Sequence, residues 1–182
     1  LPILDSATMM NKGLELIEAS FLFDMPVSEI EVVIHPQSIV HSMVEYNDGS
    51  FLAQLGSPDM RTPIAHAMAY PNRISSGVER LDIFKLGNLN FVRPDLEKFK
   101  CLGLAYQAMQ QGSYACIALN ASNEIAVQAF LNGDICLTDI ADINEKVLLQ
   151  AEKQPIGSLQ AILAVDKLSR EQAHQCIADL NA

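Results

Sequence analysis

A short polar series near the amino terminus combines groups that together could bind a phosphorylated sugar and a metal ion. The stretch DSATMMNKGLELIEA, residues 5–19, contains a hydroxyl at Ser6, an amide at Asn11, an ammonium at Lys12 and a carboxylate at Glu15. Such donors near a helix start suit a phosphate or a polyol, because free backbone amides and the helix dipole also favour an anion there. A carboxylate one turn further on is a hard oxygen ligand for a divalent cation. One carboxylate does not make a metal site, so further ligands have to come from elsewhere.

The apolar residues of the same stretch predict the helix that carries these groups. They recur at the spacing of an amphipathic helix, at Met10, Leu14, Ile17 and Phe21. We expect this helix to run from about residue 7 to 20, with Ser6 as its N-cap. The polar groups fall on another face, because residues three and four apart share one side of a helix.

Two interpretations of the polar face remain open. In the first, it is a solvated surface on which Lys12 and Glu15 form an ion pair that stabilises the helix by a few tenths of a kcal/mol. In the second, the face binds a ligand. Gly13 favours the second, since a glycine inside a helix costs about 1 kcal/mol relative to alanine and leaves open space beside Asn11 and Lys12.

Two further stretches contain side chains that could take part in chemistry. In VIHPQSIVHSMV, residues 33–44, His35 is typical of a histidine packed in a core, whereas His41 lies mid-strand and could hydrogen-bond a substrate hydroxyl. In LGSPDMRTP, residues 55–63, a loop leads from a strand to a helix start. This loop is either an ordinary turn or a segment that lays the apolar side chain of Met60 against a flat cofactor ring.

Strand and helix signals place these stretches in a mixed structure. EVVIH, residues 31–35, predicts a short buried strand, and the NDG turn at residues 47–49 predicts a β-hairpin over residues 39–56. Both faces of the hairpin carry apolar residues, so we expect a helix to cover one face and a partner subunit the other. Thr62 is the expected N-cap of a helix that ends before Pro71.

The second half of the chain predicts a helical bundle. Helices are expected, with a break near Leu168 in the last of them, at residues 98–111, 116–131, 138–153 and 158–180. Thr138 and Ser158 are the expected caps of the last two helices, and Asn120 and Asn123 are interpreted as helix-start residues. No cluster of reactive side chains is evident in this half, which we interpret as scaffold.

The fold class that follows is α+β. A short strand, a β-hairpin and helices are followed by a C-terminal antiparallel helical bundle. We expect the mixed part at residues 1–71, a connector at 72–97 and the bundle at 98–182. The connector is inferred from its prolines, glycines and scattered polar residues, which show no sustained period.

Charge and composition disfavour several classes of function. The chain carries 22 acidic and 12 basic residues, a net charge of −10, which disfavours nucleic acid and anionic membranes because both bind clustered Lys and Arg. A single phosphorylated small molecule needs only one lysine and a few amides. No apolar run approaches the roughly 20 residues of a membrane span. The four widely spaced cysteines form no C-x-x-C pair and indicate free thiols in a reducing compartment, here the cytoplasm.

Four stretches, in order along nearly the whole chain, carry a resemblance to a known family. They are DSATMMNKGLELIEA, IHPQSIVHSMVEYNDGS, AQLGSPDMRTPIAHAMAYPNR and ALNASNEIAVQAFL. Together they resemble 1-deoxy-D-xylulose 5-phosphate reductoisomerase. The resemblance implies a homodimeric enzyme that isomerises and reduces a five-carbon sugar phosphate to 2-C-methyl-D-erythritol 4-phosphate in non-mevalonate isoprenoid synthesis. It also implies NADPH and Mg²⁺ or Mn²⁺ as cofactors.

Carried over position by position, the resemblance implies roles for the residues already singled out. These are substrate binding by Ser6, Asn11 and Lys12, metal ligation by Glu15, an approach to the nicotinamide by Pro58 and Met60, and a place in the catalytic region for Lys12 and His41. The polar face of the first helix is thus assigned to ligand binding both by its chemistry and by the resemblance.

The resemblance also implies parts that are absent from this sequence. An NADPH-binding Rossmann-like domain, further metal carboxylates and a mobile lid would precede the point where the chain begins. We therefore expect the chain to be the C-terminal portion of such an enzyme and to be inactive alone. The resemblance implies that residues 1–71 are the C-terminal part of a catalytic domain, so that the chain holds a partial α/β catalytic domain. The alternative is a non-catalytic helical module that mediates dimerisation or another interaction, which leaves Ser6, Asn11, Lys12 and Glu15 unexplained.

Overall fold

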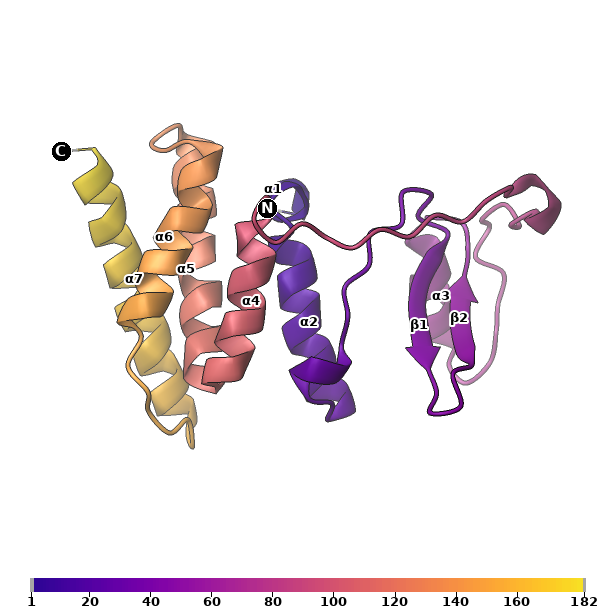
Figure 1. The fold of residues 1–182 in the computed structure, drawn as a ribbon, viewed down its shortest axis with the longest axis horizontal. Coiled ribbons are helices and arrows are strands. Elements are labelled where there is room, and N and C mark those ends of the chain that lie inside the picture. The colour runs from indigo at the N-terminus through magenta and orange to yellow at the C-terminus, as the bar shows by residue number, and fades with distance from the viewer. Residues whose placement is uncertain (1, 182) are drawn as a thin grey trace. The chain divides into compact units, whose positions relative to one another are not determined.

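The computed structural model describes residues 2–181, whose contacts divide into two compact units. The first unit is helical and comprises the chain up to Val32 and from Pro94 onward. The second comprises Val33–Arg93 and contains a two-stranded sheet. These elements make the chain α+β, as expected (Figure 1).

The helical unit is built around one long central helix, α5. The elements of this unit are α1 (Pro2–Ala7), α2 (Met10–Phe23), the 3-10 turn η1 (Val27–Glu29), α4 (Lys100–Gln111), α5 (Ser113–Asn132), α6 (Leu137–Gln150) and α7 (Leu159–Leu180). Helix α5 packs against α4, α6 and α7, and α2 packs on α4. Small, fully buried side chains let the neighbours approach α5 closely, at Ala115, Ala118, Ala121 and Ala126. A helix that is apolar on most sides is typical of such a central position.

The crossing of α2 and α4 explains the glycine inside α2. Gly13 is buried, and a Cβ built on it would lie 2.7 Å from the Cβ of Ala105 and 3.6 Å from the carbonyl oxygen of Cys101. The interpretation of Gly13 as open space beside Asn11 and Lys12 is therefore wrong. The glycine lets two helices approach each other, and its presence says nothing about a ligand.

We expect Gly13→Ala to destabilise the helical unit by about 1–3 kcal/mol, despite the higher helix propensity of alanine, because overpacking forces the two helix backbones apart. Chemical unfolding followed by far-UV circular dichroism measures this change. The double variant Gly13→Ala/Ala105→Gly moves the methyl group to the other side of the crossing and should recover part of the loss. A single variant more stable than the parent chain would contradict the close crossing.

The second unit carries the β-hairpin and the loop that follows it. Its elements are β1 (Val40–Glu45), β2 (Phe51–Leu55), α3 (Arg61–Ala69) and the 3-10 turn η2 (Ile83–Lys85). The strands pair antiparallel, with Met43 opposite Ala53. The turn is as expected: Gly49 has a φ of 81° and donates its N–H to the carbonyl of Tyr46 over 2.8 Å. Large apolar side chains of both strands are exposed in this chain, so the expected cover of the hairpin faces stays a prediction.

The expected single helix from residue 7 to 20 is wrong at its start. Helices α1 and α2 are separate because Met9, between them, adopts a left-handed φ of 58°. The hydroxyl of Thr8 occupies the junction, where it donates to the Leu4 carbonyl over 3.1 Å and accepts the N–H of Met10 over 3.3 Å. Ser6 therefore lies inside α1 and is not the N-cap of α2.

The buried stripe of α2 is also shifted from the expected one. Met10, Gly13 and Leu16 are the buried residues, whereas Phe21 is 61% exposed. The shift follows from the packing partner, because the stripe has to face α4, which lies close against Gly13. Sequence periodicity alone does not identify that partner.

Two expected elements in other parts of the chain are corrected by the structure. Residues 31–35 do not form a strand; Ile34 makes one isolated antiparallel bridge with Val92. Helix α7 continues without a break through Leu168, because the residues around it, Val165 and Ser169, are buried against the rest of the helical unit. Tertiary packing outweighs the local capping pattern there.

The helix caps are partly as expected. Ser158 caps α7, and its hydroxyl accepts the N–H of Ala161 over 3.2 Å. Helix α6 starts before Thr138, since the Asp139 carboxylate accepts the N–H of the N-cap Cys136 over 2.7 Å. Thr62 is likewise not a cap, because α3 already includes Arg61.

The two units do not follow the expected segment boundaries. Because α2 packs on α4, the residues before Val32 join the bundle rather than the hairpin. The expected division refers to the parts of a whole enzyme and stays a prediction; its segments are 1–71, 72–97 and 98–182. In the described part of the chain, no helix combines the length and apolar character that a bilayer crossing requires. The cysteines are free thiols, as expected, and only Cys136 of them is exposed.

Candidate functional site

Three of the four polar groups predicted near the amino terminus meet at one carboxylate. The amide of Asn11 donates through Nδ2 to Glu15 Oε1 over 2.6 Å, and Lys12 Nζ lies 2.5 Å from Glu15 Oε2. The spacing explains both contacts, because residues three and four apart on α2 share a face. Both carboxylate oxygens are therefore held by donors at the surface of α2.

This arrangement can open to a ligand at little cost. The side chains of Lys12 and Glu15 are 51% and 47% exposed, so solvent screens the ion pair and its contribution is at most about 1 kcal/mol. Glu15 can offer an oxygen to a divalent cation, and Asn11 and Lys12 can donate to an anion or a hydroxyl. Within residues 2–181, no group of three or more His, Cys, Asp or Glu side chains could hold a metal ion. The assignment of Glu15 as a metal ligand therefore stays a prediction.

Ser6 belongs to a different helix from the other three groups. It lies in α1 and is exposed, and its carbonyl accepts the N–H of Met9 over 3.2 Å at the junction between the helices. Its backbone is therefore placed by α1 and not by the helical spacing of α2. The structure brings Asn11, Lys12 and Glu15 together and places Ser6 on the preceding element.

His41 has a structural partner that the sequence did not reveal. Its Nε2 lies 3.2 Å from the carbonyl oxygen of Gly56, the residue after β2. A carbonyl only accepts, so Nε2 carries the proton and Nδ1 is the acceptor of the neutral ring. His41 therefore ties β1 to the start of the loop that contains Pro58 and Met60.

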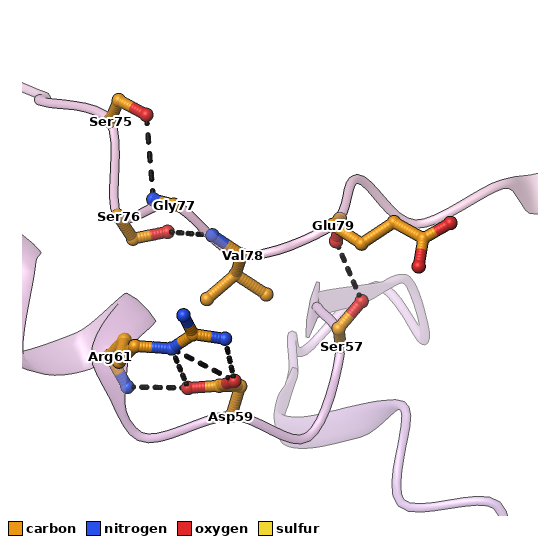
Figure 2. A network of polar contacts seen from close by, with 8 residues as sticks. All are labelled: Ser57, Asp59, Arg61, Ser75, Ser76, Gly77, Val78 and Glu79. Carbon is orange, nitrogen blue, oxygen red and sulfur yellow. Dashed lines mark hydrogen bonds and ion pairs between the residues drawn. The ribbon is translucent and has the colours of Figure 1, made fainter.

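That loop is held by polar contacts on both sides of Pro58 (Figure 2). Asp59 accepts two hydrogen bonds on Oδ1, from the N–H of Arg61 over 2.9 Å and from its Nε over 3.0 Å, while Nη2 donates to Oδ2 over 2.7 Å. The hydroxyl of Ser57 donates to the carbonyl of Glu79 over 3.1 Å. Met60 follows these two held residues and directly precedes α3. Its side chain remains 70% exposed and can contact a flat ligand.

The contacts of Asp59 predict an unusual titration. Hydrogen bonds from the Arg61 side chain and backbone lower the pKa of the Asp59 carboxyl to about 2. A carboxyl with a depressed pKa stabilises the loop above its unfolded pKa of 3.8, and this contribution is lost as the pH falls towards 2. Carboxyl-carbon NMR should show a midpoint near 2 in the chain and a higher midpoint in Arg61→Ala. A midpoint unchanged by that substitution would contradict the contact.

Sequence reasoning missed a buried polar group in the helical unit. Asn123 is not a helix-start residue but lies in the middle of α5, 3% exposed, and its Nδ2 donates to Asp5 Oδ1 over 2.9 Å. Asn144 of α6 is fully buried and donates to Asn123 Oδ1 over 3.1 Å. The sequence did contain a signal for this buried group, because the amide of Asn123 stands among alanines and apolar residues inside a long helix. The helical unit is therefore more than an apolar scaffold.

Comparison with known proteins decides the family. Residues 55–172 match the family described as DXP reductoisomerase C-terminal domain, which is more than half of the chain. The chain belongs to this DXP reductoisomerase C-terminal domain family. The resemblance drawn from the four motifs is thereby confirmed.

Relatives named 1-deoxy-D-xylulose 5-phosphate reductoisomerase cover nearly all of this chain. The protein of Psychrobacter cryohalolentis is 62% identical over 179 residues, and that of Shewanella baltica OS223 is 58% identical over 176 residues. Each match takes in 97% of this chain but 44% of the relative. The chain thus spans less than half the length of these DXP reductoisomerases.

Solved DXP reductoisomerase structures share the fold. A crystal structure of the enzyme in complex with NADPH, fosmidomycin and magnesium matches 98% of this chain with a TM-score of 0.93 and 58% identity, which is 46% of that structure's chain. The enzyme of Zymomonas mobilis in complex with NADPH matches 96% of this chain with a TM-score of 0.89 and 50% identity, again 46% of that chain. The roles of individual residues in this chain stay predictions.

Proposed function

We propose that this chain is part of an enzyme that isomerises and reduces 1-deoxy-D-xylulose 5-phosphate to 2-C-methyl-D-erythritol 4-phosphate in isoprenoid synthesis. NADPH and Mg²⁺ or Mn²⁺ are the proposed cofactors, in line with the NADPH and magnesium named for the matching structures. The observation that carries the proposal is the meeting of Asn11 and Lys12 at Glu15 on a chain of this family.

The surface of α2 would bind the charged and hydroxylated parts of the substrate. Lys12 would offer an ammonium and Asn11 an amide, and Ser6 would add a hydroxyl from α1. Glu15 would be one ligand of the divalent cation, which when bound polarises substrate oxygens. Each donor is at the surface of its helix, so none has to leave a packed core to reach a ligand.

The second unit would contribute the surface against the nicotinamide. Met60 would lie against the ring and Pro58 would stiffen the loop before it. His41 would act mainly by holding the start of this loop through the carbonyl of Gly56. A homodimer in the cytoplasm is proposed for the whole enzyme, and the free thiols of this chain are compatible with a reducing compartment.

A hybrid enzyme tests the proposal. In it, this chain replaces the matching segment of the Psychrobacter cryohalolentis relative, which is 62% identical. We expect the hybrid to oxidise NADPH when 1-deoxy-D-xylulose 5-phosphate and Mg²⁺ are present, and we expect the 182-residue chain alone to show no turnover. A folded hybrid without turnover would overturn the proposed function, and turnover by the chain alone would overturn its assignment as an incomplete part.

The same hybrid separates this function from the alternative, a helical dimerisation or interaction module. The enzyme proposal predicts that Ser6→Ala and Lys12→Ala each weaken binding of a phosphate-bearing substrate analogue, measured by calorimetry. The interaction module predicts no change from either substitution. The exposed apolar side chains of the hairpin, such as Phe51 and Leu52, fit both cases, because a larger enzyme would also cover them.

A further inference from the structure

A chain of buried hydrogen bonds runs through the helical unit and ends on α1. Ser122 Oγ donates to Asn144 Oδ1 over 2.9 Å, Asn144 Nδ2 donates to Asn123 Oδ1 over 3.1 Å, and Asn123 Nδ2 donates to Asp5 Oδ1 over 2.9 Å. The first three side chains are at most 3% exposed. Every link donates in the same direction, towards the carboxylate of Asp5. Such aligned bonds polarise one another in an interior of low dielectric constant.

The burial of these groups makes the bond to Asp5 valuable. A buried amide without a partner costs several times more than a typical hydrogen bond contributes, so Asn123 needs an acceptor at the position that Asp5 occupies. Asp5 and Asn123 are 118 residues apart in sequence, which makes the contact purely tertiary. It joins α1 to the centre of α5.

Helix α1 depends on tertiary contacts, among them the packing of Leu4 against the core of the helical unit. It has six residues, which is too short for a helix to be stable without tertiary contacts. Its C-terminal end turns at Met9, and the side chain of Thr8 lies against Cys101 of α4, whose thiol pKa is raised by burial to about 11. The Asp5 carboxylate is thus a polar anchor of α1 on the centre of α5, and Ser6 is the next residue.

We infer that Asn123 is a positioning residue for the sugar-phosphate site: its hydrogen bond to Asp5 fixes α1 and thereby the place of Ser6 relative to α2. The substrate in this inference rests on the proposed function, whereas the placement of α1 does not. Residues of the helical unit that are remote in sequence from the site thus set the geometry of substrate binding.

The first test uses the hybrid enzyme. Asn123→Ala should raise KM for the sugar phosphate about tenfold, the effect of one lost hydrogen bond to a charged group, and leave KM for NADPH within about twofold. Asn120→Ala removes an amide of the same helix that bonds Glu124 at the surface, and should change neither constant. An unchanged KM for the sugar phosphate in Asn123→Ala would overturn the inference.

Exchange of the two side chains separates positioning from general destabilisation. Asn123→Asp alone sets two carboxylates against each other and should raise KM for the sugar phosphate more than Asn123→Ala does. In Asp5→Asn/Asn123→Asp, an amide donates from α1 to a carboxylate in α5, which can still accept from Asn144. This double variant should recover KM to within about threefold of the parent hybrid. A double variant as impaired as Asn123→Asp would overturn the inference.

A second measurement does not depend on catalysis or on variants of the bundle interior. In the full 182-residue chain, the N–H of Thr8 donates to the Leu4 carbonyl over 2.9 Å and reports the stability of α1. Asp5→Ala should speed amide exchange at Thr8 about tenfold, and by a larger factor than it speeds exchange in the middle of α5, where Asn123 also loses its acceptor. Unchanged exchange at Thr8 would overturn the inference even if the hybrid is active, while an inactive parent hybrid together with faster exchange would refute only the proposed function.

Discussion

Glu15→Gln in the hybrid enzyme should lower kcat/KM at least about a hundredfold, which corresponds to about 3 kcal/mol of transition-state stabilisation. The substitution keeps the shape of the side chain and removes its negative charge. A divalent cation then loses a charged oxygen ligand, and Lys12 loses the carboxylate that lies 2.5 Å from its Nζ. Steady-state rates over a series of Mg²⁺ concentrations measure the effect, and the concentration for half-maximal activity should rise.

Glu18→Gln is the matched control for this substitution. Glu18 is an exposed glutamate of the same helix, three residues further along, and its substitution changes the net charge by the same amount. We expect its kcat/KM to stay within about twofold of the parent hybrid, because a surface charge beyond the site affects the rate little. Unchanged turnover of Glu15→Gln at saturating Mg²⁺ would show that Glu15 is only a surface charge.

Asn144→Ala should destabilise the helical unit by about 3 kcal/mol, the largest stability effect that we expect from a single side chain here. Asn144 is fully buried and is both the acceptor for Ser122 and the donor to Asn123. Alanine removes the donor to the buried Asn123 Oδ1 and leaves Ser122 with the Leu119 carbonyl as its remaining partner, and it also leaves a cavity. Urea unfolding followed by far-UV circular dichroism reports mainly on this unit, which holds six of the seven α-helices found in residues 2–181.

The control for this measurement is Asn120→Ala. Asn120 also occurs in the helical unit, but its amide bonds Glu124 at the surface over 3.2 Å, where water can replace the contact. We expect a change of less than about 0.5 kcal/mol. Equal losses for the two variants would contradict the assignment of Asn144 to a buried network.

Local sequence was sufficient for elements whose signal lies within a few residues. The NDG turn predicts the hairpin, because a glycine is needed at the positive φ of Gly49. Ser158 predicts the start of α7, since a cap acts on amides two or three residues away. The grouping of Asn11, Lys12 and Glu15 followed in the same way from helical spacing.

The errors occurred where packing outweighs local preference. The pattern near Leu168 resembles a helix start, but α7 continues because its neighbours are buried. Ser6 resembles a cap, but the left-handed Met9 moves the start of α2 three residues further on, beyond Thr8. For α7, burial against the rest of the helical unit, which no short window of sequence contains, decides that the helix continues.

The order of residue types along the chain was enough for the family, the α+β class and the polar face of α2, because each depends on motifs or on spacing within one element. Packing between elements assigned Gly13 to a helix crossing and connected Asn123 to Asp5. These two roles arise from atoms about 90 and 118 residues apart, since Gly13 meets Ala105 and Asn123 meets Asp5. Side-chain contacts at such separations depend on how helices are stacked, which periodicity within one helix does not specify.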